Sequence, residues 1–514
     1  MRKGFLTALV LLLLLVCAAA SAETKITVSP ENPRVGDYVD VVVAPGKDGA
    51  KAVRYTLSTP AGTVFEGEED KHFKASFRPR TEAVYTLTVT VSYGKKDVET
   101  ASVTVPVSGA APEQAGPDVV YSQKDGWWHD KVYSKTEKRS VEKSGCALFA
   151  LSHALQRMGH TGADVQPDHL AKTYSNMYIK ERGTDNERLL KTAGEAYGFQ
   201  THEDLIESEA ELTVWLRQGC YFSFEIAKGH IAMADGLSED GTKVHVVDSA
   251  TGATFERIKK GTIYYQKEDG SFAEAATPED LPGNRYFFET GEYGGMAYWL
   301  DLSYCARKGM RPIRNPWMTT EDGAAAEPEY AGAMVTRVSV AGGEPVRVNT
   351  RDLHWTTQGA DDPTLALVTK KGGVSFVDGN GKKKEGFGKK IAWGTMLPVL
   401  AETEKQWYVF YRGKFGFIDK KGAQALPVEQ DEFRTGLVSL NGRTAGTTPV
   451  NFRMDGTAKS SIVGDWKPGT PVALVEKKGE FWLAEGKGRR GWIHEKYITA
   501  EGADTDGQKV DEGE

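Results

Sequence analysis

The chain has 514 residues and a net charge of −7, a length typical of three or four domains. A modestly acidic chain without a long basic run argues against nucleic acid as the main partner. After the N-terminal segment, no stretch is long and apolar enough for a membrane span.

The N-terminus has the pattern of a secretion signal. Two basic residues precede an apolar run over residues 6–16, and Ala20 and Ala22 follow with the spacing that signal peptidase recognises. The run is too short to span a bilayer comfortably. We therefore expect residues 1–22 to be cleaved and the protein to be secreted, extracellular or associated with the cell wall.

Residues 23–108 show alternating β patterns separated by turn residues. Several short strands at this spacing predict a small β-sandwich. The sequence around Pro30 and Gly36, with Tyr85 later, resembles bacterial immunoglobulin-like modules. The segment has no cysteine pair, and the resemblance carries no chemistry by itself. Residues 109–117, rich in Ala, Pro, Gly and Glu, are expected to be a linker.

Residues 118–316 mix helical and β patterns. Leu148, Leu151 and Leu155 form one apolar stripe, which predicts a helix over residues 148–158. Two more helices and three strands are expected over residues 187–197, 212–217, 221–226, 230–234 and 243–247. Helices first and strands later, joined by short links, predict an α+β domain.

The C-terminal part contains an internal repeat after a linker over residues 317–335. Gly394, Trp407 and Gly416 match later residues at one constant offset of 75 residues, which indicates duplicated modules. The later partners are Gly469, Trp482 and Gly491. Both copies resemble bacterial SH3-like barrels, and we expect them over residues 336–426 and 440–500, followed by a disordered acidic tail over 501–514.

Three cysteines follow the expected signal peptide, and an odd number in an exported protein points to a reactive thiol. Cys146 lies at the start of the 148–158 helix, where free amides and the helix dipole stabilise a thiolate. Cys220 and Cys305 are expected to be buried thiols, with a disulfide between them as the alternative.

A base and an orienting acid are available on a predicted hairpin. His230 opens one strand and Asp248 ends the next, so an antiparallel pairing places them at the same end. Asp248 would hold the imidazole Nδ1 proton and leave Nε2 facing the thiol of Cys146. Asp235 is the rival acid, but its odd offset from His230 turns it to the other face. Two further histidines, His153 and His245, are expected to be packing residues.

These residues resemble the papain-like family of bacteriocin-processing peptidases, which cleave after double-glycine leaders, and its secreted relatives. The resemblance rests on residues 123–128, Ser144-Gly145-Cys146, Gly229-His230 and Val247-Asp248-Ser249. It implies a papain-like fold in which Gln123 supplies an oxyanion-hole donor beside the Cys146 backbone N–H. The chain departs from the family's Gly-Pro-Thr after the cysteine and from its proline after the aspartate. The peptidoglycan amidases that carry Asp-Cys-Ser-Gly match less well.

The sequence thus predicts a multidomain protein with an α+β papain-like central domain between an N-terminal β-sandwich and C-terminal SH3-like barrels. Its expected function is a secreted cysteine hydrolase that cleaves peptide or peptidoglycan-stem amides, with the SH3-like modules holding it near cell-wall polymer. The alternative is a non-catalytic cell-surface protein that retains a papain-like scaffold. No cofactor is expected, and no residues have structural zinc spacing.

Overall fold

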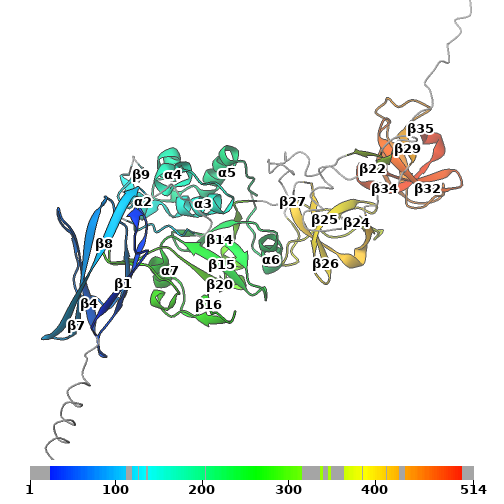
Figure 1. Ribbon diagram of the computed structural model, residues 1–514. Coiled ribbons are helices and arrows are strands. Elements are labelled where there is room, and N and C mark those ends of the chain that lie inside the picture. Colours follow the sequence, from blue (N-terminus) through cyan, green and yellow to red (C-terminus); the bar gives the residue numbers. More distant parts are fainter. Residues whose placement is uncertain are drawn as a thin grey trace, which may run out of the picture. The chain divides into compact units, whose positions relative to one another are not determined.

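The computed structural model describes residues 23–110, 119–314 and 364–500 apart from short breaks, together with β22 (Thr336–Ser339) and β23 (Pro345–Val348) (Figure 1). The expected signal peptide, most of both linkers and the acidic tail lie outside the described residues. The protein is multidomain and mostly β, with seven α-helices in the described ranges. Within those ranges, no helix has the length and apolar character needed to cross a membrane.

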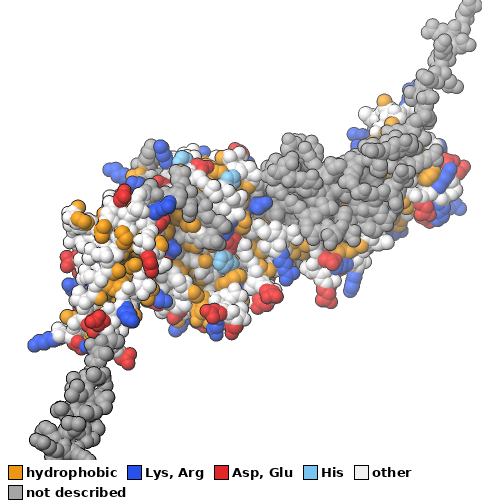
Figure 2. All heavy atoms as spheres, in the orientation of Figure 1, with side chains coloured by type: hydrophobic (Ala, Val, Ile, Leu, Met, Phe, Trp, Pro, Cys, Tyr) orange, Lys and Arg blue, Asp and Glu red, His pale blue; other side chains and the backbone are white. Residues whose placement is uncertain are grey.

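The chain forms two compact units. One contains Met1–Ala193 and Tyr221–Ile313, and the other contains Gly194–Cys220 and Arg314–Glu514. The residues coloured in Figure 2 carry acidic and basic side chains interspersed on the face shown, without one large patch of either sign.

Two β-sheets at the start of the first unit share one core. The order of the first is β1-β3-β6-β18-β19 and that of the second is β2-β8-β7-β4-β5. Their strands are β1 (Lys25–Ser29), β2 (Arg34–Val35), β3 (Val39–Ala44), β4 (Ala52–Thr59), β5 (Gly62–Glu66), β6 (Lys74–Phe77), β7 (Ala83–Gly94), β8 (Asp97–Ala110), β18 (Tyr286–Phe287) and β19 (Glu292–Tyr293). Side chains such as Val39, Val41 and Leu87 alternate inward along the strands and are fully buried. We call residues 23–110 with β18 and β19 the sandwich.

The rest of the first unit is built on a seven-stranded antiparallel sheet in the order β17-β16-β20-β15-β14-β13-β21. Its strands are β13 (Phe222–Ala227), β14 (His230–Leu237), β15 (Lys243–Asp248), β16 (Ile263–Gln266), β17 (Phe272–Glu274), β20 (Met296–Asp301) and β21 (Arg311–Pro312). The accompanying helices are α2 (Val141–Ser144), α3 (Cys146–Arg157), α4 (Pro167–Thr173), α5 (Asn186–Tyr197), α7 (Thr251–Arg257) and α8 (Leu302–Lys308). Two short ribbons, β9 (Val132–Ser134) with β10 (Arg139–Ser140) and β11 (Tyr178–Ile179) with β12 (Gly183–Thr184), complete it.

Helix α3 is the buried helix of this region. Its side chains from Ala147 to Gln156 are buried, which matches an apolar sequence with almost no charge. It ends at Arg157, and Gly159, the residue after its C-cap, has a φ of 92° that few other residues adopt. The helix begins two residues before the predicted start, so Cys146 is its first residue.

The second unit contains two β-modules with the same strand register. The first repeat is β24 (Thr364–Val368), β25 (Met396–Glu402), β26 (Gln406–Tyr411), β27 (Lys414–Asp419) and β28 (Ala423–Pro427). The second repeat is β29 (Arg434–Val438), β30 (Val450–Arg453), β31 (Ile462–Trp466), β32 (Pro471–Lys478), β33 (Phe481–Gly486), β34 (Arg489–His494) and β35 (Ile498–Ala500). The second repeat begins before the expected residue 440, because strand β29 pairs with β32 and β35 and therefore belongs to it.

The two tryptophans of the repeat lie at equivalent positions, as the constant offset predicts. Trp407 pairs with Ile418, and Trp482 pairs with Ile493 in the same place of the second repeat. Even the β-bulge between Val399 and Ala401 recurs between Leu474 and Glu476. A shared irregularity of this kind indicates duplication more strongly than shared composition does.

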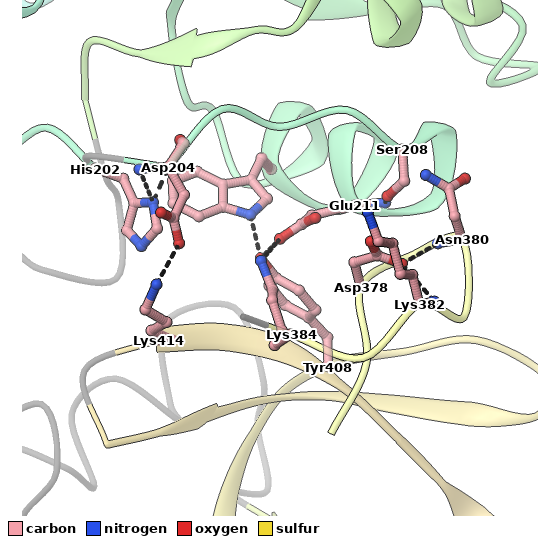
Figure 3. Close-up of polar contacts among 11 residues, drawn as sticks. His202, Asp204, Ser208, Glu211, Asp378, Asn380, Lys382, Lys384, Tyr408 and Lys414 are labelled. Atoms are coloured by element: carbon pink, nitrogen blue, oxygen red, sulfur yellow. Dashed lines mark hydrogen bonds and ion pairs between the residues drawn. The ribbon is translucent and has the colours of Figure 1, made fainter. Parts of the chain in front are cut away.

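Helix α6 (Glu209–Arg217) packs on the first repeat, although its sequence lies between α5 and β13 (Figure 3). The hydroxyl of Tyr408 accepts a hydrogen bond from Trp215 Nε1 at 2.5 Å and donates one to Glu211 Oε1 at 2.8 Å. Lys384 lies 3.7 Å from the same carboxylate. Burial raises the pKa of Glu211, and Lys384 and Tyr408 oppose that rise. At the offset of 75 residues, the second repeat has Leu483 in place of Tyr408, so this polar contact is not duplicated.

Candidate active site

The only partly exposed thiol of the described residues opens helix α3. Cys146 follows Gly145, where a Cβ would lie 2.5 Å from the carbonyl oxygen of Val141. Glycine at 145 therefore lets the end of α2 turn directly into α3. This local packing places Cys146 at the N-terminus of a twelve-residue helix, where the backbone dipole favours a thiolate.

The predicted hairpin brings His230 to Asp248. Strands β14 and β15 pair antiparallel, and Nε2 of His230 lies 2.6 Å from Oδ1 of Asp248. Both side chains are buried. On its other side the His230 ring interacts with the thiol of Cys146. One chain of contacts therefore runs from sulfur through imidazole to carboxylate.

One detail of the prediction is wrong. We expected Nδ1 of His230 to face Asp248, whereas Nε2 does so. Met233 pairs with Val247, so Asp248 lies opposite a position two residues beyond His230 along β14. The ring therefore reaches the carboxylate with the nitrogen farther from its backbone, and Nδ1 is left for the thiol.

The carboxylate of Asp248 is hydrogen-bonded on both oxygens. Oδ1 also accepts from the backbone N–H of Ala250 at 2.8 Å. Oδ2 accepts from the hydroxyl of Tyr298 at 2.7 Å and from that of Thr254. Every donor stabilises the ionised form, which a buried carboxylate needs in order to stay charged.

The three groups shift one another's pKa values in the direction of an ion pair. Burial would raise the pKa of Cys146, but the hydrogen bond and charge of His230 lower it overall, with help from the N–H groups of Ile231 and Ala147. Burial opposes charge on His230, yet Asp248 and the thiolate raise its pKa to about 10. Despite burial, His230 and the other donors lower the pKa of Asp248 to about 2. These shifts favour a thiolate on Cys146 beside an imidazolium on His230.

Gln123 is held between the segments that carry Cys146 and Asp248. Its backbone N–H donates to Ser249 O at 2.8 Å, and its Oε1 accepts from the Ser249 hydroxyl at 3.1 Å. Its Nε2 donates to the carbonyl oxygen of Glu142, in α2. That carbonyl can only accept, which fixes the orientation of the amide. Nε2 carries a second hydrogen besides the one that it donates to Glu142.

The other polar candidates have separate partners. Asp235 lies 2.5 Å from Nδ1 of His245 and also binds Arg157, at the end of α3 farthest from Cys146. The side-chain parity that we used to exclude it does not apply, because a register shift lies between Ala234 and Gly236. Among the described residues, no cluster of His, Cys, Asp and Glu is arranged to bind a metal.

His153 is buried and accepts the backbone N–H of Tyr121 at 2.9 Å. Burial and the nearby charge of Arg157 lower its pKa to about 3, so the ring is neutral. It packs α3 against the segment before Gln123.

Cys220 and Cys305 are buried thiols that are not joined in a disulfide. Burial raises the pKa of both the Cys220 and the Cys305 thiol.

Sequence reasoning missed two residues of the site, Thr254 and Tyr298, and named Ser249 without giving it a role. Tyr298 is reached only through the pairing of β15 with β20, where Val246 faces it. No local pattern in a single sequence predicts the register between β15 and β20. Ser249 follows Asp248 directly, and its position beside the acid was the available signal.

Comparisons with known proteins add little to this geometry. No protein-family model matches the sequence, and no curated protein matches it. Two solved structures align with part of the chain, NlpC1 and NlpC2 from Trichomonas vaginalis, each with 12% identity and a TM-score of 0.12. The alignments cover 30% and 29% of this chain, and 51% and 52% of those chains, so it spans about half of their length. A likeness at this TM-score carries no argument about fold or chemistry.

Proposed function

We propose that the protein is a cysteine hydrolase that cleaves amide bonds through Cys146, His230, Asp248 and Gln123. The observation that carries the proposal is the buried contact between His230 Nε2 and Asp248 Oδ1, 2.6 Å long, with Cys146 on the other side of the ring. A structural histidine does not need a fully hydrogen-bonded carboxylate and a thiol with a lowered pKa.

The proposed reaction has two stages. The thiolate of Cys146 attacks the amide carbonyl carbon, and the resulting oxyanion accepts hydrogen bonds from Gln123 Nε2 and the Cys146 N–H. The His230 imidazolium gives its proton to the leaving amine nitrogen as the C–N bond breaks, which leaves a thioester. His230 then removes a proton from water, which attacks the thioester and releases the acid and the thiol. Asp248 holds the ring throughout.

Further parts of the proposal come from the sequence. The papain-like resemblance favours a peptide or peptidoglycan-stem substrate. The repeats are proposed to be SH3-like modules that hold the enzyme near cell-wall polymer, and the N-terminal signal pattern favours secretion.

A small acyl donor tests the chemistry before the substrate is known. p-Nitrophenyl acetate would acetylate the Cys146 sulfur and release nitrophenolate, whereas iodoacetamide alkylates sulfur without forming an oxyanion. We expect a nitrophenolate burst from the wild type, none from Cys146→Ala, and a normal burst from Cys305→Ala. Gln123→Ala should lower the acylation rate by roughly a hundredfold or more, the usual scale for one oxyanion donor. Its alkylation rate should change little.

The alternative is a non-catalytic surface protein on the same scaffold. It predicts equal acylation of the wild type and Cys146→Ala. It also predicts that Gln123→Ala changes the acylation rate no more than the alkylation rate. That result would overturn the proposed hydrolase.

A further inference from the structure

The segment that carries Gln123 lies against the sandwich. We call residues 120–129 the Gln123 loop. Within it, the N–H of Asp125 donates to Ser122 O at 3.3 Å, and the indole N–H of the fully buried Trp128 donates to the same oxygen at 2.8 Å. Gln123 therefore sits inside a turn whose two ends are Ser122 and Asp125, and the placement of those ends sets the placement of Gln123.

The sandwich holds the Asp125 end of this turn. Arg78 follows β6 directly, and its guanidinium Nη1 lies 3.3 Å from Oδ2 of Asp125, which is fully buried. The other oxygen, Oδ1, accepts the Trp127 N–H at 2.7 Å. The Asp125 carbonyl accepts the N–H groups of Trp128 and His129 at 3.2 and 2.9 Å. A single aspartate thus orders the loop, and Arg78 neutralises it.

Aromatic contacts fix the guanidinium. Its central carbon lies 5.0 Å from the ring centres of Trp127 and Trp128 and 5.1 Å from that of Tyr38. Tyr38 also accepts the N–H of Ser122 at 3.4 Å, so the sandwich reaches the other end of the turn as well. Arg78 and Tyr38 both belong to the sandwich, and they contact both ends of the turn around Gln123.

The sandwich is joined to the rest of the first unit by more than these side chains. Strand β18, which belongs to the sandwich although it lies much later in the chain, pairs in parallel with β6 through Phe287 and Ser76. Phe288 stacks on Tyr55 in the sandwich core with 5.0 Å between ring centres. Arg78 follows that same strand β6, so its backbone is held by a sheet shared with residues from the region of the candidate site.

We propose that Arg78 is a positioning residue for the oxyanion donor Gln123 and acts through Asp125. The sandwich would thereby help to hold the active site in its geometry. This inference rests on the proposed function. It assigns to the N-terminal module a role that a spacer or a separate binding domain does not have.

The test compares Arg78→Gln in two backgrounds, wild type and Gln123→Ala. Arg54→Gln, an exposed arginine on β4, is the matched control, and Arg78→Lys is the conservative variant. The readouts are acylation of Cys146 by p-nitrophenyl acetate, its alkylation by iodoacetamide, and hydrogen exchange of the amides of residues 121–129.

Arg78→Gln should slow acylation about tenfold in the wild-type background, less than the roughly hundredfold cost of removing the oxyanion donor outright, and change alkylation by less than about twofold. In the Gln123→Ala background it should have almost no further effect, because two changes on one route are not additive. Arg78→Lys, which keeps the charge, should recover part of the rate. Arg54→Gln should match the wild type throughout.

Equal losses in both backgrounds, or equal losses with both reagents, would show that Arg78 only supports folding. Hydrogen exchange separates this inference from the proposed function. If Cys146 proves unreactive in the wild type, the hydrolase proposal fails. Faster exchange of the loop in Arg78→Gln and Arg78→Lys would then still support positioning, and unchanged exchange would overturn it.

Discussion

The carboxylate of Asp248 accepts hydrogen bonds from four groups that come from four parts of the chain: β14, the turn after β15, α7 and β20. Three of them do not touch the thiol or the imidazole. They hold the rotamer of the acid and keep it ionised, so His230 has a fixed counter-charge.

Tyr298→Phe should therefore weaken the site without removing any proposed catalytic group. A buried hydrogen bond to a charged group contributes about 1.5–3 kcal/mol, and we expect a loss of that order in the free energy of unfolding, measured by urea denaturation. The nitrophenyl acetate rate should fall several-fold. Tyr304→Phe is the control, because Tyr304 donates to the neutral carbonyl of Ile226 at 2.6 Å. A larger rate loss in the control than in Tyr298→Phe would contradict the role assigned to Tyr298.

The pH dependence of thiol alkylation is a second prediction at this scale. The pKa of Cys146 is lowered by His230, while burial raises those of Cys220 and Cys305. Below the ordinary thiol pKa, Cys146 should keep reacting with iodoacetamide while the other two stop. In Asp248→Asn the imidazolium loses its counter-charge, so the Cys146 profile should move to higher pH. Mass spectrometry of each cysteine measures this, and three identical profiles would count against the ion pair.

Two local features of the candidate site were predictable from residue patterns: Cys146 starts a helix, and the hairpin brings His230 to Asp248. Gln123 was proposed through the family resemblance, and its role as an oxyanion donor stays a prediction. The sequence did not predict which ring nitrogen of His230 faces Asp248, or that Tyr298 and Thr254 donate hydrogen bonds to that carboxylate. These contacts depend on the register between distant strands and on the direction of side chains, which a single sequence does not specify.

At the scale of elements, the two repeats share the same packing of a strand glycine against an aromatic ring, although most other residues differ. Gly416 and Gly491 pair with Val409 and Ala484 at corresponding positions. A Cβ at Gly416 would lie 2.8 Å from the ring of Phe376, and one at Gly491 would lie 2.3 Å from the ring of Phe452. The glycine-aromatic match in the sequence therefore marks a close contact of strand and ring.

Gly416→Ala and Gly491→Ala should each destabilise their own repeat by roughly 1–3 kcal/mol, the usual cost of overpacking. Gly372→Ala in the first repeat is the control, since its Cβ would meet nothing within 4 Å. Hydrogen exchange of β27 and β34 would locate each effect. If either variant loosened both repeats equally, the two would unfold as one body rather than as separate modules.

The helices and strands with strong local patterns were predicted closely: α3, α5 and the β14–β15 hairpin begin and end within a few residues of the expected ranges. Two features were not predictable. Strands β18 and β19 are too short to have a period, and they pair with a sheet far away in sequence. Helix α6 was predicted as a helix, but its partner was not, because the side chains that receive it lie almost 200 residues later.

At the scale of the whole molecule, the chain leaves the first unit after Ala193, returns at Tyr221 and leaves again after Ile313. A division by sequence patterns places residues 194–220 with the candidate active site, yet α6 packs on the first repeat. The repeats are therefore not simply appended to the C-terminus, and a fragment ending at the 317–335 linker would expose the buried Trp215.

Gly379→Ala tests that packing. Its Cβ would lie 1.9 Å from Oγ of Ser208, the N-cap of α6, while its backbone conformation tolerates alanine. We expect faster hydrogen exchange in residues 204–217 and a lower melting temperature. Glu211→Ala should act in the same direction by leaving Tyr408 and Lys384 without their buried acceptor. Gly388→Ala, where the added Cβ meets nothing within 4 Å, is the control. Unchanged exchange in both variants would mean that the contact contributes little.

The parallel pairing of β6 with β18 also has a consequence for biosynthesis. The ribosome makes β18 about 200 residues after β6, which at roughly 5–20 residues per second is on the order of 10–40 seconds later. Throughout that time one sheet of the sandwich lacks its last two strands, and β6 is an open edge with free backbone donors and acceptors. Until β18 and β19 have been made, the N-terminal module can complete only part of this sheet, and the β6 edge is open to pairing with another chain.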